Sequence, residues 1–525
     1  LTNEQLKKAG FTDPSKVRLY GYGGRLITEN FAFTGKNGLI DDLNEVPLYR
    51  REGSVLFYAE GVLTWNSNTK FTRNTFSNYS YYFLTEAQAD ETPASLKTLA
   101  APVSETTEEV TTVIDHALND NEAFVWYAGG RRFYDNNELQ NGHTFKLSLP
   151  GNTGAECQIA YDVSAASKST STFTITNTTD GKQMASGYFS KLGEGEEARG
   201  YNGSFKLETN EEARFTISTQ AKGRLNYLYA TYQRYLTPQC NKAFTTEKHG
   251  NILLCVEGAD NNTRVWKLGD AQSQVAELPG TLSGSTYKAH VFDVSDRYVV
   301  VNVAANYDSP TIVGNVENQN LHADKDIDYV IIVPASNKLT AQAERLAQAH
   351  RDTNGLRVKV VRADQLYNEF SSGTPDASAY RRYLKMLYDK AESMDNAPRY
   401  LLLFGECNYD NRMISDEMKN SSPDDYLLAY ERSEEEKKTG EYKLGTLYDY
   451  VTEDYYGMLD DNEGSNIVTE KLDLGIGRFL CSDEESAKWL VDQAIRYDRN
   501  ENTGAWKNNM WAIADAGNNN LHMQD

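Results

Sequence analysis

The sequence predicts a multidomain protein in which all-β, sandwich-like domains precede part of an α/β domain with a parallel sheet. The length of 525 residues corresponds to about three to four domains. Up to about residue 322, short apolar bursts alternate with turns rich in Gly, Asn and Asp, as in the strands of sandwiches. After Asp328, continuous apolar runs alternate with helical patterns, which is typical of a parallel α/β sheet.

We expect a first β domain at 1–240 and a smaller second β domain at 241–322. In the first, Thr170–Asn177 alternates polar and apolar residues with period two, which predicts a half-buried antiparallel strand. In the second, three apolar bursts predict strands at Ile252–Val256, Arg264–Leu268 and Arg297–Asn302.

The third domain, 323–525, contains predicted strands and helices in alternation. The apolar run Tyr329–Val333 predicts a strand covered on both faces. Further strands are predicted at Leu356–Val361, Tyr400–Phe404, Leu472–Ile476 and Met510–Ala514. Helices are predicted at about 340–353 before Gly355, after an N-cap at Asp376, and from the capping box Ser482–Glu485 to about Arg499. Because a strand at 510–514 would need further crossover elements, we expect the chain to stop within this domain.

Composition excludes several classes of protein. Lys plus Arg number 53 and Asp plus Glu 75, so the net charge is −22, which argues against a nucleic-acid partner. No apolar run is long enough to span a membrane, and the start LTNEQLKKAG lacks a signal core. If the protein is exported, this is a processed start. The five cysteines contain no CxxC pair, which excludes a zinc ribbon and a dense disulfide framework.

Candidate functional residues follow the predicted strands, because parallel sheets bind ligands beyond their carboxyl ends. The candidates for a substrate cleft are Glu406, Cys407, Asp454 and Arg478. Cys407 could be a nucleophile if a histidine lay nearby, and the candidates are His350, on the apolar face of a helix, and His522. A structural ion pair is the preferred role for Arg478, and turn capping for Asp454 and for Asp515.

The connection 424–463 carries 13 acids and 4 bases. Asp460, Asp461 and Glu463 offer oxygens for a calcium ion, although their spacing is not that of an EF-hand. The alternatives are a solvated acidic surface or a surface for a basic partner. We favour an exposed, mobile loop at about 430–445, because Glu434–Lys438 has the composition of solvated sequence.

From these features alone the function stays open, but seven segments in order resemble one family. Three lie in the β part and four in the α/β part: Asp13–Gly24, Val55–Gly61, Asn78–Thr85, Leu401–Gly405, Asp454–Gly457, Leu474–Phe479 and Ile495–Asn500. Together they resemble the gingipain family of cysteine peptidases, in particular its branch of type IX secretion-system sortases.

The resemblance implies a caspase-like α/β catalytic domain with a Cys–His dyad that acts through a thioester. It implies removal of the C-terminal signal domain from secreted cargo, and transfer of the cargo to an amine of anionic lipopolysaccharide. The implied location is the outer-membrane surface of a Gram-negative bacterium of the Bacteroidetes type, beside a PorV-like outer-membrane β-barrel partner. No cofactor is required, calcium is optional, and nucleic acid is not a partner.

The resemblance also implies where the dyad lies. The family's histidine lies in a Gly-His-Gly segment and its cysteine in a later loop; this chain has no such segment and no cysteine after Cys481. The dyad is therefore expected beyond Asp525, and the 525-residue chain is expected to be inactive. Cys407 stands where the gingipain branch has a histidine, and Asp515 is the nearest match to an accessory acid.

Two other functions stay open. One is a gingipain-like secreted peptidase with β pro-domains and specificity for basic residues. The other is a non-catalytic surface module whose Tyr-rich β domains bind glycans or a barrel partner. A Gly-His-Gly segment and a later loop cysteine in the native gene would favour the enzyme.

Overall fold

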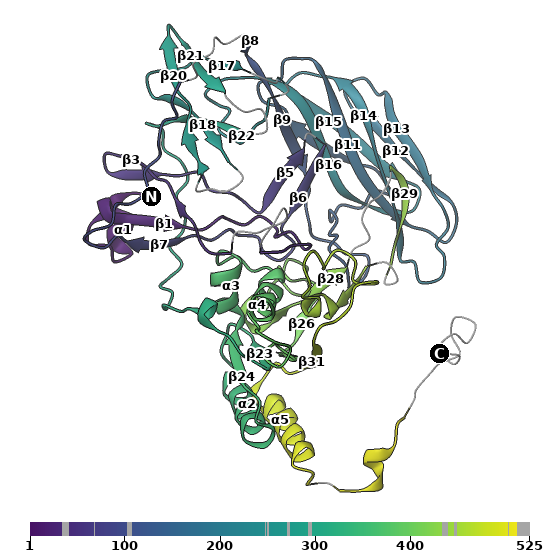
Figure 1. Ribbon diagram of the computed structural model, residues 1–525. Helices are drawn as coiled ribbons and strands as arrows, with labels where there is room; N and C mark the ends of the chain where they lie inside the picture. The colour runs from purple at the N-terminus through teal and green to yellow at the C-terminus, as the bar shows by residue number, and fades with distance from the viewer. Residues whose placement is uncertain are drawn as a thin grey trace.

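The computed structural model describes residues 1–33, 41–67, 69–101, 108–246, 248, 251–269, 274–291, 297–432, 439–445, 449–501 and 503–511. Strands account for 37% and helices for 16% of the structure. Figure 1 shows the β part above and the α/β part below, which confirms the predicted multidomain architecture. No helix in these ranges is both long enough and apolar enough to cross a membrane.

The chain begins with a small antiparallel sheet of order β2-β1-β7. The elements of this part are α1 Asn3–Lys8, β1 Val17–Tyr20, β2 Glu45–Val46, β3 Tyr49–Arg51, β4 Ser54–Leu56, β5 Leu63–Ser67, β6 Lys70–Arg73 and β7 Phe83–Glu86. Helix α1 begins with a capping box, in which the Thr2 side chain accepts the Gln5 N–H. Its Leu6 packs with Val17 and Leu19 of β1 in a local core.

A two-sheet antiparallel sandwich follows, with orders β29-β14-β11-β16-β9 and β10-β15-β12-β13. Its consecutive strands are β9 Thr112–Asn119, β10 His143–Ser148, β11 Glu156–Ala166, β12 Ser171–Asn177, β13 Gln183–Phe189, β14 Ala198–Glu208, β15 Glu212–Thr219 and β16 Lys222–Tyr235. Phe173 and Ile175 of β12 point into the core between the sheets, as the period-two pattern predicts.

The next region forms two smaller sheets, of order β20-β21-β17-β8 and β19-β18-β22. The strands are β8 Glu108–Val110, β17 Ile252–Glu257, β18 Thr263–Leu268, β19 Ala276–Glu277, β20 Gly280–Ser283, β21 Thr286–Val291 and β22 Arg297–Asn302. The three apolar bursts predicted as strands are β17, β18 and β22. The parallel pairing of β8 with β17 connects segments on opposite sides of the boundary predicted at residues 240/241.

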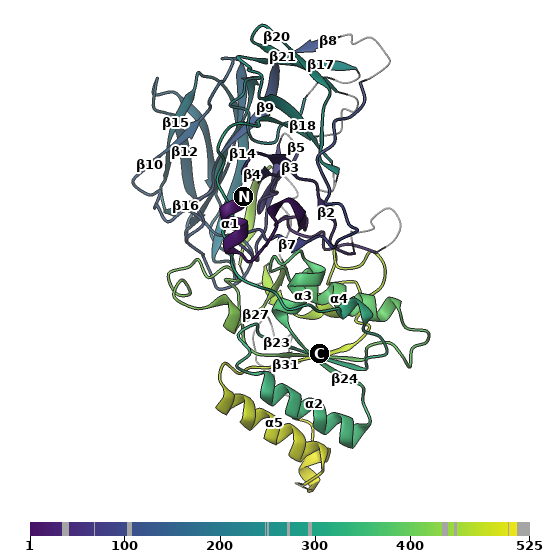
Figure 2. The same ribbon diagram turned by 90° about the vertical axis from the view of Figure 1, so that its left-hand side faces the viewer.

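The α/β part contains a four-stranded parallel sheet of order β24-β23-β25-β31. Its elements are β23 Tyr329–Val333, α2 Thr340–Asn354, β24 Val358–Arg362, α3 Ala363–Phe370, α4 Ser378–Asp389, β25 Tyr400–Phe404, β31 Gly475–Phe479 and α5 Glu484–Asp498. Figure 2 shows α2 and α5 on one face and α3 and α4 on the other. Alternate residues of β23 therefore enter different cores: Val330 and Ile332 face α3 and α4, whereas Ile331 and Val333 face α2 and α5.

Several local predictions for this part were wrong. The fourth strand is β31, which begins three residues after the predicted Leu472. Helix α3 was not predicted, because it follows β24 with no intervening loop. Helix α4 begins at Ser378, with Ala377 in the N-cap position. The predicted cap, Asp376, does accept the Ser378 N–H, and its other oxygen accepts the Ile27 N–H.

Two further corrections concern the C-terminal region. The N-cap of α5 is Asp483, one residue after the predicted N-cap Ser482, and its carboxylate accepts the Ser486 N–H. Met510 and Trp511 are exposed and outside any strand, whereas the rest of the predicted strand, 512–514, lies outside the described residues.

The connection between β25 and β31 contains short elements instead of one long loop. They are β26 Cys407–Asn408, η4 Pro423–Asp425, β27 Leu427–Leu428, β28 Tyr430–Arg432, β29 Gly440–Leu444, β30 Tyr450–Thr452 and η5 Asp454–Gly457. The expectation of a mobile loop at 430–445 is wrong for Gly440–Leu444, because this segment forms an edge strand of the sandwich. The residues 433–438 lie outside the described residues.

Candidate functional site at the carboxyl edge of the sheet

The carboxyl ends of β25 and β31 are joined closely. The Gly405 N–H donates to the Phe479 carbonyl at 3.0 Å. Gly405 has a φ of +152°, and a Cβ at this position would lie 2.9 Å from the Pro334 ring, which follows β23. Glycine at this position thus allows the carboxyl ends of β23, β25 and β31 to lie close together. The segments that follow these strands form one edge of the domain.

Cys407 begins the short strand β26, two residues after Gly405. It pairs with Leu427, so that β26 and β27 extend the edge with a short parallel ladder. The Glu406 carbonyl accepts the Leu427 N–H at 2.9 Å. Burial raises the pKa of the Cys407 thiol, and the nearby Arg478 guanidinium acts in the opposite direction.

His350 lies far from Cys407 along the sheet. Its ring centroid is 5.3 Å from that of Tyr329, the first residue of β23, and its Nδ1 is 2.9 Å from Asn354 Oδ1. Tyr329 marks the amino end of the sheet, whereas Cys407 follows the carboxyl end. The structure therefore does not bring the two side chains together, and His522 lies outside the described residues.

Arg478 and Glu453 form an ion pair above the end of β31. Arg478 also donates from Nη1 to the Gly405 carbonyl at 2.9 Å. This is the structural role preferred from the sequence. Asp454, the next residue, opens η5 with an exposed side chain, and Asp515 lies outside the described residues.

The calcium candidates lie at the other end of the domain. Asp461 pairs with Lys385 at 2.7 Å, and Asp460 accepts the Tyr388 hydroxyl at 3.1 Å. Both partners belong to the last part of α4, near the amino ends of the strands. Among the described residues of the acidic connection, Leu427 and Glu453 contact the carboxyl edge, through Glu406 and Arg478. Among the described residues there is no group of three His, Cys, Asp or Glu side chains suited to a metal ion.

Sequence reasoning missed a buried layer of ionisable side chains between this edge and the β part. Arg412 donates to both carboxylate oxygens of Glu122 at 2.6 and 2.8 Å. Glu431 is 2% exposed, and burial raises its pKa well above the ordinary value, with nearby Asp410 adding to the shift. Arg412 and Glu122 are 290 residues apart in the chain, so no local sequence pattern could have indicated the pair.

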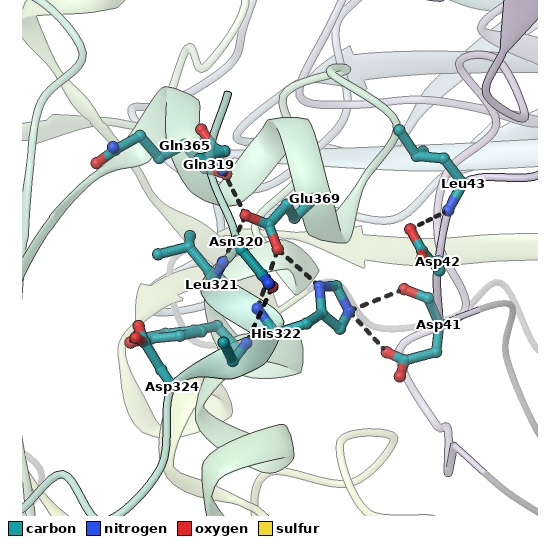
Figure 3. Close-up of polar contacts among 12 residues, drawn as sticks. Asp41, Asp42, Leu43, Gln319, Asn320, Leu321, His322, Asp324, Gln365 and Glu369 are labelled. Carbon is teal, nitrogen blue, oxygen red and sulfur yellow. Dashed lines mark hydrogen bonds and ion pairs between the residues drawn. The ribbon is translucent and has the colours of Figure 1, made fainter. Parts of the chain in front are cut away.

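A second missed cluster joins the start of the α/β part to the N-terminal region (Figure 3). His322 in η3 Leu321–Ala323 has Nδ1 2.7 Å from a Glu369 oxygen and Nε2 3.3 Å from an Asp41 oxygen. Hydrogen bonds with Asp41 and Glu369 raise the pKa of His322 to about 9. Burial alone would raise the pKa of Glu369, but bonds from His322 and from backbone N–H groups hold it at about 2.

Comparison with known proteins gives the context of this edge. Residues 322–525 match peptidase family C25. The whole chain is similar in structure to latent PorU from Porphyromonas gingivalis, with a TM-score of 0.82 and 25% identity over 100% of this chain and 50% of that protein. The chain thus spans half the length of the protein it matches.

No curated protein matches the sequence. A carbohydrate binding module of Cellvibrio mixtus lichenase 5A has 13% identity over 23% of this chain and 94% of its own, with a TM-score of 0.14. The resemblance drawn from the seven sequence segments is confirmed, and residues 322–525 are a domain of peptidase family C25, the gingipain family, in a chain whose fold resembles that of PorU.

Proposed function

We propose that the protein containing this chain is a cysteine peptidase and sortase of the type IX secretion system. The observation that carries the proposal is the structural similarity to PorU over the full length of this chain, together with the family C25 domain. The β part and the first strands of the α/β part have the same arrangement as in that protein, so the similarity is not limited to a catalytic module.

The proposed reaction begins with attack of a thiolate on the peptide bond before the C-terminal signal domain of cargo. A thioester forms, the signal domain leaves with a proton from an imidazole, and the thioester is resolved by water or by an amine of anionic lipopolysaccharide. The proposal assigns the cysteine and histidine to residues outside this chain. Cys407 and His350, at opposite ends of the sheet, do not form the dyad.

The role proposed for this chain is to build the substrate cleft and its support. Glu406, Cys407, Asp454 and Arg478 lie along the carboxyl edge where such a cleft would form. The proposed partners are cargo with a C-terminal signal domain, a PorV-like outer-membrane barrel and anionic lipopolysaccharide, at the cell surface. Calcium at Asp460, Asp461 and Glu463 stays a prediction.

The test compares the purified 525-residue chain with the full-length protein on a cargo that carries its signal domain. We expect the full-length protein to release the signal domain, and the 525-residue chain to release none in the same time. Full-length Cys407→Ala should still release the signal domain, at most more slowly, because Cys407 is placed in the cleft but is not the proposed nucleophile. Turnover by the 525-residue chain that Cys407→Ala abolishes would contradict the placement of the dyad, and a full-length protein that neither cleaves nor transfers cargo would contradict the function.

A further inference from the structure

One segment of the α/β part is built into the sandwich. Residues 439–445, here named the strap, contain β29, which pairs in antiparallel fashion with β14 from Ala198↔Leu444 to Asn202↔Gly440. The elements before and after it, β28 and β30, pair with each other in the α/β part. Figure 1 shows β29 at the edge of the sandwich, apart from its sequence neighbours.

Tyr442, the central residue of the strap, packs against the sandwich and is partly buried. Its hydroxyl lies 2.7 Å from each carboxylate oxygen of Asp162, which is 0% exposed. Asn226 donates to the same carboxylate at 2.8 Å. A Cβ at Gly200 would overlap the Tyr442 ring, so only glycine leaves room for the ring at this position.

The other residues of the strap are also bound. The Ser190 hydroxyl donates to Glu441 at 2.8 Å, and Lys443 pairs with Glu196 at 3.2 Å. Leu444 is buried against Ala198 and Tyr134. Main-chain pairing with alternating side-chain contacts is the mode by which an edge strand is added to a sheet.

A continuous set of contacts leads from the strap to the carboxyl edge. Arg132 lies over the Tyr442 ring, 5.2 Å from its centroid, and 3.4 Å from a carboxylate oxygen of the buried Asp449. The Tyr127 hydroxyl donates to the same oxygen at 2.8 Å. Asp449 immediately precedes β30, whose last residue, Thr452, is followed by Glu453.

Glu453 completes the connection, because it pairs with Arg478, which donates to the Gly405 carbonyl two residues before Cys407. Every step from Tyr442 to Cys407 is therefore a direct contact or a covalent neighbour. This series of contacts can transmit a displacement only if the residues in it move together. Whether a change at Tyr442 alters the exposure of Cys407 can be measured.

We propose that the strap makes the sandwich a positioning element for the carboxyl edge, with Tyr442 as the positioning residue. The inference rests on the proposed function only in calling this edge the substrate cleft. When the strap is bound, the segment between β25 and β31 is held by the sandwich at residues 439–445 and by Arg478 at Glu453. When Tyr442 loses its contact with Asp162, the contacts around Glu453 and Arg478 loosen and solvent reaches Cys407.

The five cysteines of the chain supply the measurement. Cys407 is half-buried, and Cys157, Cys240, Cys255 and Cys481 are buried. Cys157 lies in the sandwich core, where its thiol donates to the Leu207 carbonyl at 3.0 Å. A thiol reagent applied under native conditions, with the sites identified by peptide mass spectrometry, thus reports the edge through Cys407 and global opening through Cys157.

We expect Tyr442→Phe in the 525-residue chain to label Cys407 about tenfold faster, with Cys157 unchanged, because a tenfold change corresponds to about 1.4 kcal/mol, close to the contribution of one hydrogen bond to a charged group. The matched control is Tyr188→Phe, an exposed tyrosine of β13 in the same sandwich, which should label like the wild type. Asp162→Asn combined with Tyr442→Phe should add little to Tyr442→Phe alone, since both changes break the same contact.

Two results would overturn the inference. One is a Cys407 rate that Tyr442→Phe leaves unchanged, since the strap would then be only a local attachment. The other is a parallel rise at Cys407 and Cys157, which would mean general destabilisation. Neither depends on catalysis, so an inactive full-length protein would contradict the proposed function and leave this result in place.

Discussion

The two helical layers of the α/β part differ in what covers them. Helix α2 has a solvent-exposed side, and its arginines lie there: Arg345 pairs with Asp492 of α5 with its side chain 40% exposed. Helix α4 contains Arg381, Arg382 and Lys385, each at most 1% exposed. The difference arises because the N-terminal region and the 457–464 segment cover the outer side of α4, whereas the outer side of α2 faces solvent.

Backbone carbonyls accept hydrogen bonds from the two buried arginines of α4, whereas Lys385 pairs with Asp389 and Asp461. Arg381 donates to the carbonyls of Met458, Glu29 and Glu463 at 2.6, 2.6 and 2.9 Å. Arg382 donates to the Phe370 carbonyl at 2.6 Å and to the Tyr22 hydroxyl at 3.0 Å. Helix α4 therefore joins segments more than 300 residues apart through its buried charges, whereas the Arg345 charge on α2 pairs at an exposed site.

The largest expected effect comes from removing one of these cations. Arg381→Met should lower the free energy of unfolding by about 3–5 kcal/mol, because three buried carbonyls lose a charged donor. Arg345→Met on α2 is the matched control and should cost about 0–1 kcal/mol, as for an exposed pair. Denaturant unfolding of both variants provides the measurement, and equal losses would remove the distinction between the layers.

The same difference in covering explains what the sequence could and could not predict. Local period and composition predict the parallel sheet, α2 and the strands β12, β17, β18 and β22. The apolar residues of each of these elements recur at the spacing that places them on its buried face. Arg381 and Lys385 look like surface residues of an amphipathic helix. Their burial depends on segments such as 22–33, whose contacts with α4 no local pattern specifies.

The candidate site divides in the same way. The position of Cys407 and Arg478 at the carboxyl edge follows from strand order alone. Tyr442 could not be predicted to enter the sandwich, because its partner Asp162 is 280 residues away and the surrounding charge indicates a solvated loop. Glu431, Glu122 and His322 were missed for the same reason.

An effect of intermediate size is expected at His322, which joins the two parts outside α4. Its folded pKa of about 9 lies above the ordinary 6.5, so its contribution is complete below about pH 6.5 and is lost as the pH rises through 9. The Glu369 contribution, with a folded pKa of about 2 against 4.5, is lost only in acid. His322→Gln should cost about 1–2 kcal/mol near pH 6, after allowance for partial exposure, and less by pH 9.5.

Denaturation at pH 6, 7.5 and 9.5 checks this. A double-mutant cycle with Glu369→Gln should give a coupling that shrinks over the same range. A pH-independent loss would mean that His322 contributes through packing, for example through its stacking on Phe370 at 4.6 Å, and that the ion pairs matter little.

The smallest effect is expected at Glu431, and it should have the opposite sign from that of a buried ion pair. Burial raises the folded pKa of Glu431 well above 4.5, so the folded protein holds a proton that the unfolded chain has lost. The free energy of unfolding therefore falls as the pH rises above 4.5.

Glu431→Gln keeps the shape of the neutral acid and removes this titration. It should match the wild type at pH 5 and be more stable at pH 8 by about 1 kcal/mol or more. Glu122→Gln, which takes a charged partner from Arg412, is the control and should cost about 2–4 kcal/mol at pH 8. Unfolding midpoints at pH 5 and 8 separate the two cases. A large loss for Glu431→Gln at pH 8 would show that Glu431 is ionised and paired, so that the layer between the edge and the β part would be held by charge throughout.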